Sequence, residues 1–85
     1  MTRSALQQTM AALEALFDQM ISQQRAKVLA VARSLDPRLT EDDILSPHDF
    51  EELAGDPRFN YEDGLLAGLI SAQIAVRARL REMSG

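Results

Sequence analysis

The sequence predicts an all-α protein: a long helical hairpin, with short helices in the connection, that assembles as an antiparallel helical bundle dimer. Residues 4–35 contain neither Pro nor Gly, and apolar residues recur in them every three or four positions. The C-terminal stretch repeats this pattern, and signals that begin and end helices crowd the segment between. A single domain of 85 residues without cysteine buries little surface, so we expect a second copy or a partner to complete its core.

The first helix is predicted over residues 5–35. Ser4 and Gln7 have the spacing of a capping box at its start. Pro37 disfavours a helical conformation at Asp36 and so ends the helix. The apolar row along this helix is Leu6, Met10, Leu13, Phe17, Met20, Ile21, Val28, Val31 and Leu35, with Gln24 among them.

The connection is predicted to hold two short helices, over residues 41–45 and 47–54. Thr40 precedes three acidic residues, as an N-cap before a negative first turn does. Ser46-Pro47 has a cap residue before Pro, and Gly55 ends the second short helix. Three of the four aromatic residues lie in or beside this segment, and we expect them to pin it to the bundle: Phe50, Phe59 and Tyr61.

The last helix is predicted over residues 61–83, capped by Asn60 after an Asp56-Pro57 turn, with Glu62 and Asp63 complementing its dipole. Its first half is apolar almost all round, which one partner helix would not cover. The bundle core is expected from Leu13, Phe17, Met20, Val28, Leu66, Leu69, Ile70, Val76 and Leu80. The oligomer interface is expected from Leu66, Gly68, Leu69, Gln73, Val76, Leu80, Phe17 and Gln24.

Gln24 and Gln73 interrupt the apolar rows of the two long helices. A buried amide needs a partner, and a polar residue in a core is a device that sets register or oligomeric state. In an antiparallel hairpin both lie near mid-helix, so they are expected to meet each other or their symmetry mates. The alternative is that one or both lie at the wet edge of the apolar stripe.

Gly64, Gly68 and Ala72 repeat at a spacing of four in the last helix. Such a strip lets another helix approach closely, and glycine within a helix costs about 1 kcal/mol relative to alanine, which favours a packing role. The alternative is that Gly64 only eases the helix start and that Gly68 is incidental.

Charge is distributed unevenly along the chain. Residues 41–63 contain nine of the thirteen Asp and Glu residues and only Arg58 among Lys and Arg, so their net charge is -8 and that of the remainder is +4. We expect this segment to bind a protein partner of basic character, or else to serve only solubility. The candidate partner-binding residues are Glu41, Asp42, Asp43, Asp49, Glu51 and Glu52.

Other ligand classes lack a signature. The net charge of -4 argues against nucleic acid, and Arg77, Arg79 and Arg81 do not share one helix face. His48 with Glu51 or Glu52 is too sparse a set for a metal, so no metal or cofactor is expected. The N-terminus lacks the features of a signal peptide, and the most apolar window, residues 65–76, is shorter than the ~20 residues that span a bilayer. We therefore expect a bacterial-type cytoplasmic protein.

The favoured function is non-catalytic: a helical interaction module that acts as an adaptor, regulator or assembly subunit. The order of a long helix, a connection with a short helix and a second long helix also resembles the small all-α chorismate mutases. That resemblance implies an intertwined dimer with a dicarboxylate bound between facing helices by Arg, Lys, Glu and Gln. Residues of those types on the long helices here are Arg25, Arg77, Glu14 and Gln73.

Overall fold

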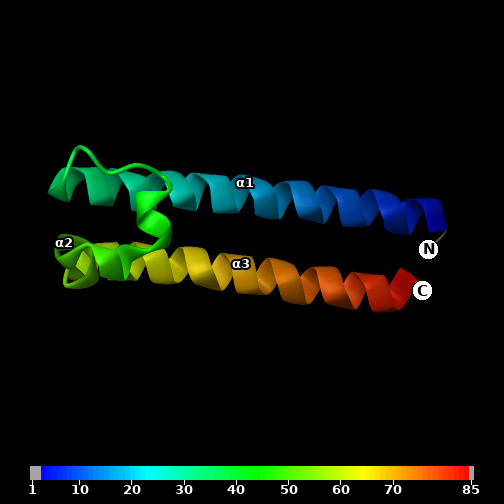
Figure 1. Cartoon of the computed structure of the whole chain (residues 1–85). Coiled ribbons are helices and arrows are strands. Elements are labelled where there is room, and N and C mark those ends of the chain that lie inside the picture. The colour runs from blue at the N-terminus through cyan, green and yellow to red at the C-terminus, as the bar shows by residue number, and fades with distance from the viewer. Residues whose placement is uncertain (1–2, 85) are drawn as a thin grey trace.

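A computed structural model describes residues 3–84 as a helical hairpin (Figure 1). The two long helices are α1 (Arg3–Leu35) and α3 (Pro57–Ser84), which pack side by side and antiparallel, with both termini at the same end. The hairpin measures 51 × 18 × 17 Å. The all-α hairpin predicted from the sequence is therefore confirmed.

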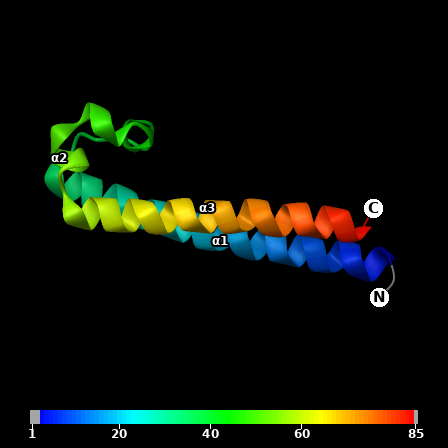
Figure 2. The ribbon, with the colours of Figure 1, turned by 90° about the horizontal axis from the view of Figure 1, so that it is seen from below.

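The connection, residues 36–56, contains the 3₁₀ helices η1 (Asp43–Leu45) and η2 (Pro47–Asp49) and the single turn α2 (Glu51–Ala54). We call it the connector. It projects from one side of the hairpin at the end away from the termini (Figure 2). Phe50 adopts an extended conformation between η2 and α2 and packs against the core, so the helix predicted over residues 47–54 is broken there.

The connector begins with two local hydrogen-bonded turns. The Asp36 carboxylate accepts hydrogen bonds from the guanidinium and the backbone N–H of Arg38, which lower the pKa of Asp36. Thr40 and Asp43 then bond reciprocally, since the Thr40 N–H donates to Asp43 Oδ2 (2.9 Å) and the Asp43 N–H donates to Thr40 Oγ1 (3.4 Å). This is the geometry of a capping box, so Asp43 stabilises the local turn.

The starts of the two long helices differ from the prediction. α1 begins at Arg3, so Ser4 lies inside the helix rather than before it. α3 begins at Pro57, because the Asp56 Oδ1 accepts a hydrogen bond from the Phe59 N–H (2.7 Å) and Pro needs no N–H partner at the first helical position. Asn60 is not the cap: it lies within α3 and its Nδ2 donates to the Ala54 carbonyl.

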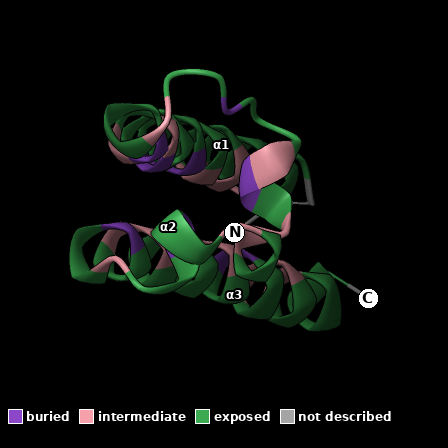
Figure 3. Ribbon diagram, turned by 60° about the vertical axis from the view of Figure 1, so that its left-hand side comes forward, coloured by how far each residue is buried: buried purple, intermediate pink, exposed green. Residues whose placement is uncertain are grey.

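The buried core lies at the connector end of the hairpin, where α1, α3 and the connector meet. Its largest fully buried side chains are Phe59, Leu53 and Val28. Figure 3 shows the buried residues on the facing sides of the long helices and on the connector. The apolar core as a whole is Ile21, Val28, Ala32, Leu39, Ile44, Leu53, Phe59 and Leu66.

The predicted core is confirmed only in part. Val28 and Leu66 are buried, and Phe17, Leu69 and Ile70 pack against the core. Leu13, Val76 and Leu80 are half-buried. Met20 and Tyr61 do not fit the prediction: both are exposed, because they lie on the outer flanks of α1 and α3 rather than on the facing sides. Among the described helices, none has an apolar stretch long enough to cross a bilayer.

Candidate interaction surfaces

Both glutamines in the apolar rows are buried, and each bonds across the hairpin. Gln24 Nε2 donates to the Glu62 carbonyl (2.9 Å) and to Glu62 Oε2 (2.6 Å). Gln73 Nε2 donates to Asp18 Oδ1 (2.9 Å). The prediction that the two amides meet each other is therefore wrong within one chain. Each instead fixes the antiparallel register by bonding a carboxylate of the facing helix.

An ion pair between Glu14 and Arg77 joins the open ends of α1 and α3. Arg77 donates from Nε to Glu14 Oε1 (2.7 Å) and from a terminal nitrogen to Oε2 (3.0 Å), which is a bidentate contact. The Arg77 guanidinium lowers the pKa of the Glu14 carboxyl, and Glu14 in turn raises the pKa of Arg77. Both side chains are part-exposed, so solvent screens this pair and its contribution to stability is small.

The residues of the chorismate-mutase-like alternative do not converge. Glu14 and Arg77 neutralise each other, and Gln73 bonds Asp18. Arg25 lies eleven residues beyond Glu14 on α1, roughly 16 Å along the helix axis, and lines surface grooves near Glu41 instead. No observation among the described residues favours a dicarboxylate site between the long helices.

The acidic connector presents its carboxylates to solvent. Glu41, Asp42, Asp49, Glu51 and Glu52 are all exposed, and none of their side-chain carboxylates accepts a hydrogen bond from the residues that the structure describes. Asp43 is half-buried and occupied by its contact with Thr40. Five of the six predicted partner-binding carboxylates are thus available to another molecule. His48 is exposed as well, and the described residues hold no group of His, Asp and Glu arranged for a metal ion.

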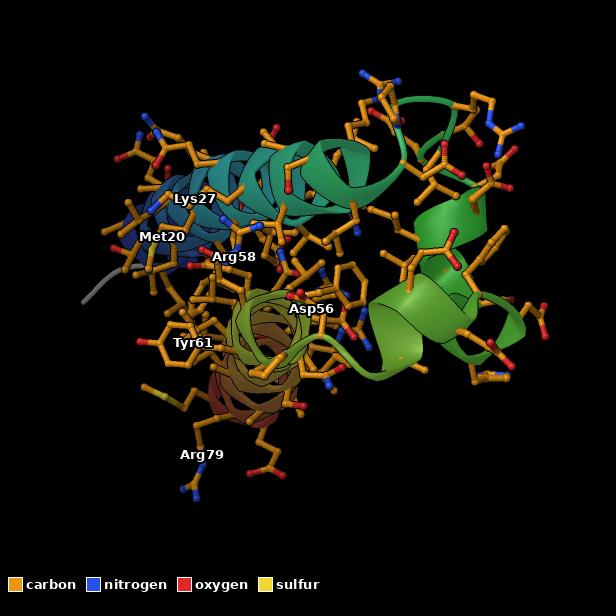
Figure 4. All side chains as sticks on the ribbon, turned by 90° about the vertical axis from the view of Figure 1, so that its left-hand side faces the viewer. Met20, Lys27, Asp56, Arg58, Tyr61 and Arg79 are labelled. Atoms are coloured by element: carbon orange, nitrogen blue, oxygen red, sulfur yellow. The ribbon has the colours of Figure 1, made fainter. Side chains whose placement is uncertain are left out.

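The flank of the hairpin opposite the connector carries exposed apolar side chains. In a view down the hairpin axis, Met20, Tyr61 and Lys27 point to the side away from the connector (Figure 4). Leu16 lies one turn before Met20, and Leu65 one turn after Tyr61, so they share this flank. Exposed fractions are 51% for Leu16, 39% for Met20, 65% for Tyr61 and 44% for Leu65. We call these four residues the far face.

The predicted interface residues divide between the seam of the hairpin and its surface. Leu66, Gln24 and Gln73 are buried between α1 and α3 within one chain. Gly68 is exposed, and a Cβ built at Gly68 or Gly64 meets no atom within 4 Å. Within a single chain, therefore, no other helix packs against the small-residue strip. Phe17, Leu69, Val76 and Leu80 are half-buried at the edges of the seam.

Sequence reasoning missed some of the residues that form these surfaces. Glu62 and Asp18, which hold the two amides, were not predicted as partners, although a carboxylate at the matching antiparallel position is a signal for them. Leu16 and Leu65 were not placed on an exposed face, because a periodic row does not show where its edge lies.

A groove separates the connector from α3. It has a volume of about 190 Å³ and is lined on the connector side by Ile44, Leu45 and Pro47 and on the α3 side by Leu66, Ala67 and Ile70. Arg25, Glu41 and Asp63 are the charged residues of its lining. The lining of the groove is therefore mainly apolar, with three charged residues in it.

Comparison with known proteins finds no matching protein-family model, no matching curated protein and no matching solved structure.

Proposed function

We propose that this protein is a non-catalytic helical interaction module, an adaptor, regulator or assembly subunit, that works as a homodimer and presents the acidic connector to a basic protein partner. The far face carries this proposal. Its four apolar side chains are exposed along a flank formed by both long helices, a place where a second hairpin would complete a bundle of four long helices.

The position of the far face supports a second copy as its occupant. Leu16 and Met20 belong to the middle of α1, and Leu65 to the first half of α3, so the exposed strip runs along the hairpin. A two-fold contact requires the same patch on both copies, and an elongated strip of this kind meets its own copy readily. Among the described residues, the eight that form the buried apolar core all lie between Ile21 and Leu66, which leaves the other half of the hairpin in need of cover.

The test of the dimer is the solution mass. Light scattering after size exclusion should give twice the 9.4 kDa of the chain. Leu65→Asp should yield the mass of one chain, because the charge would be desolvated in the interface. Ser71→Asp, on the same helix but away from the far face, should leave the mass unchanged. A folded protein of 9.4 kDa at every concentration would overturn the homodimer.

The exposed carboxylates of the connector support the choice of a basic partner. Among the six predicted partner-binding carboxylates, Asp43 alone accepts a local hydrogen bond, so the density of the other five exceeds what the short helices require. Neutralising Glu41, Asp42, Asp49, Glu51 and Glu52 to Gln or Asn, with Asp43 retained, should leave helicity and dimer mass intact and abolish capture of the native partner. Capture by the unmodified protein should weaken steeply with salt.

A control variant tests whether capture depends on the carboxylates of the connector or only on the net charge of the protein. Glu82→Gln removes a carboxylate at the other end of the hairpin and should not change capture. If the neutralised variant captures the same partner with unchanged affinity, the connector serves solubility alone.

A further inference from the structure

The groove between the connector and α3 has the size of one large apolar side chain. Its volume is about 190 Å³, and an apolar cavity of about 150 Å³ holds a benzene ring. The opposing walls are aliphatic, with Ile44, Leu45 and Pro47 facing Leu66, Ala67 and Ile70. An aromatic or branched aliphatic side chain that entered it would be surrounded by apolar groups on both sides.

Two strongly exposed apolar residues extend this groove. Leu45 is 73% exposed on the connector wall. Ile74 is 58% exposed, one turn beyond Ile70 on α3. Ala67, Ile70 and Ile74 follow the spacing of one helix face, so they form an apolar track of about 10 Å that leads out of the groove. A helix laid along such a track contacts it through side chains three and four residues apart.

The charges around the groove select the polarity of its ligand. Glu41 and Asp63 contribute two carboxylates to the lining, and Arg25 is the one cation in it. The connector wall continues into the exposed carboxylates of Asp42 and Asp49. Together these carboxylates attract cations more than anions, and they repel a second acidic surface.

We infer that this groove is the binding site for a basic amphipathic helix of a protein partner, with one large apolar side chain in the groove and others on Ile74. Lys and Arg side chains of that helix reach Glu41, Asp63 and the connector carboxylates. The inference rests on the proposed function and deepens it, because it gives the basic partner a place and a shape.

A second copy of this chain fits the groove poorly. A two-fold contact centred on the groove sets the same patch against itself, so two acidic connectors would face each other. A basic helix avoids that repulsion, and the second copy is left to the far face.

The direct test measures the binding of a synthetic peptide to the intact protein. The probe is a fluorescein-labelled peptide of four helical turns with Leu on one face and Lys on the other, and binding is measured by fluorescence anisotropy. The peptide should bind, and the same peptide with Ser in place of Leu should bind at least about tenfold more weakly, because the groove needs an apolar anchor. A peptide with Glu in place of Lys should not bind.

Two variants test whether the peptide binds in the groove. Ala67→Arg fills the groove with a cation and should weaken binding by about tenfold or more. Ala75→Arg makes the same change at an exposed position about 12 Å further along α3 and should have no effect. Leu45→Ser alters an exposed side chain, so it preserves the core, and it should also weaken binding. Circular dichroism of each variant establishes that it is folded.

Several results would overturn the inference. Unchanged binding by both Ala67→Arg and Leu45→Ser would place the peptide elsewhere on the acidic surface. If the Ser peptide bound as tightly as the Leu peptide, the binding would depend on charge alone. Loss of the dimer in both Ala67→Arg and Leu45→Ser would show that a second copy occupies the groove. If the peptide does not bind in the groove but the protein still has the mass of a dimer, the groove inference is wrong and the proposed homodimer is unaffected. The two proposals can therefore fail separately.

Discussion

The connector end and the open end of the hairpin are built from the same two helices but differ in how much they bury. At the connector end a third layer covers the helix pair, and Phe59, Leu53 and Val28 are fully buried. At the open end, beyond Ile21 on α1 and Leu66 on α3, no apolar residue with described burial falls below the half-buried range. The contacts there are polar: Gln73 with Asp18, and Arg77 with Glu14.

This difference shows what two helices accomplish without a third layer. A helix pair covers only the narrow seam between its members, so the side chains at the edges of each stripe keep contact with water. The connector covers one side of the hairpin, at the end away from the termini. The far face is left for another molecule to cover. The following predictions test the contrast, from the largest effect to the smallest.

Phe59→Ala should remove most of the stability of the connector end. Truncating a fully buried aromatic side chain typically costs about 3–5 kcal/mol in the free energy of unfolding, because it leaves a cavity. The open-end change Leu80→Ala should cost clearly less, since Leu80 is only half-buried. Urea unfolding followed by circular dichroism measures both. Equal losses would show that the open end is packed as tightly as the connector end, as a dimer interface through Leu80 would produce.

Gly68→Leu tests whether a second copy packs on the small-residue strip. If the homodimer brings another helix onto this strip, the larger side chain should lower stability by about 1–3 kcal/mol through overpacking. Within one chain there is open space at this position, so an unoccupied strip should instead gain stability from better helix propensity. We expect a lower thermal midpoint. A rise in the midpoint would refute close packing there.

Gln24→Leu should destabilise the protein more than Gln73→Leu. Gln24 holds the half-buried Glu62 carboxylate, and losing a hydrogen bond to a charged group that is shielded from water costs about 1–3 kcal/mol. Asp18, the partner of Gln73, is exposed and is resolvated when the amide is lost, so that change should be nearly neutral. Chemical denaturation at neutral pH compares the two variants. If Gln73→Leu were the more destabilising change, the hydrogen bond between Gln73 and Asp18 would contribute more to stability than the one between Gln24 and Glu62.

The smallest effect concerns the Glu14–Arg77 pair and pH. Arg77 lowers the pKa of Glu14 in the folded state below the ordinary value of 4.5, so the pair adds stability above that value. This contribution is lost as the pH falls through the lowered pKa. Glu14→Gln should therefore reduce stability slightly at neutral pH and make it less sensitive to acid below about pH 4.5. Unfolding curves at several pH values measure this, and an unchanged acid dependence would mean that the pair is open in solution.

The sequence predicted the features that depend on local patterns. The absence of Pro and Gly over residues 4–35 and the Asp36-Pro37 signal place the end of α1 at Leu35, where the structure has it. Thr40 Oγ1 accepts a hydrogen bond from the Asp43 N–H as a cap residue does, but the helix predicted over residues 41–45 is only the 3₁₀ helix η1, with Asp42 at its N-cap position. The start of α3 was predicted four residues too late, because Asn60 and Asp56 are both cap residues. The row Phe59, Leu66 and Gln73 resolves this choice, since Phe59 reaches the core only if it is already helical.

What the sequence by itself determined is the set of helices and their apolar stripes, because propensity, capping and period act over a few neighbouring residues. Only the tertiary structure decided which edge of each stripe is covered. It gave Gln24 and Gln73 carboxylate partners across the hairpin, and it left Met20 and Tyr61 exposed on the far face. It also set Leu45 opposite Ala67 across a groove. These pairings join residues far apart in the chain, and they depend on the side from which the connector folds back onto the helices.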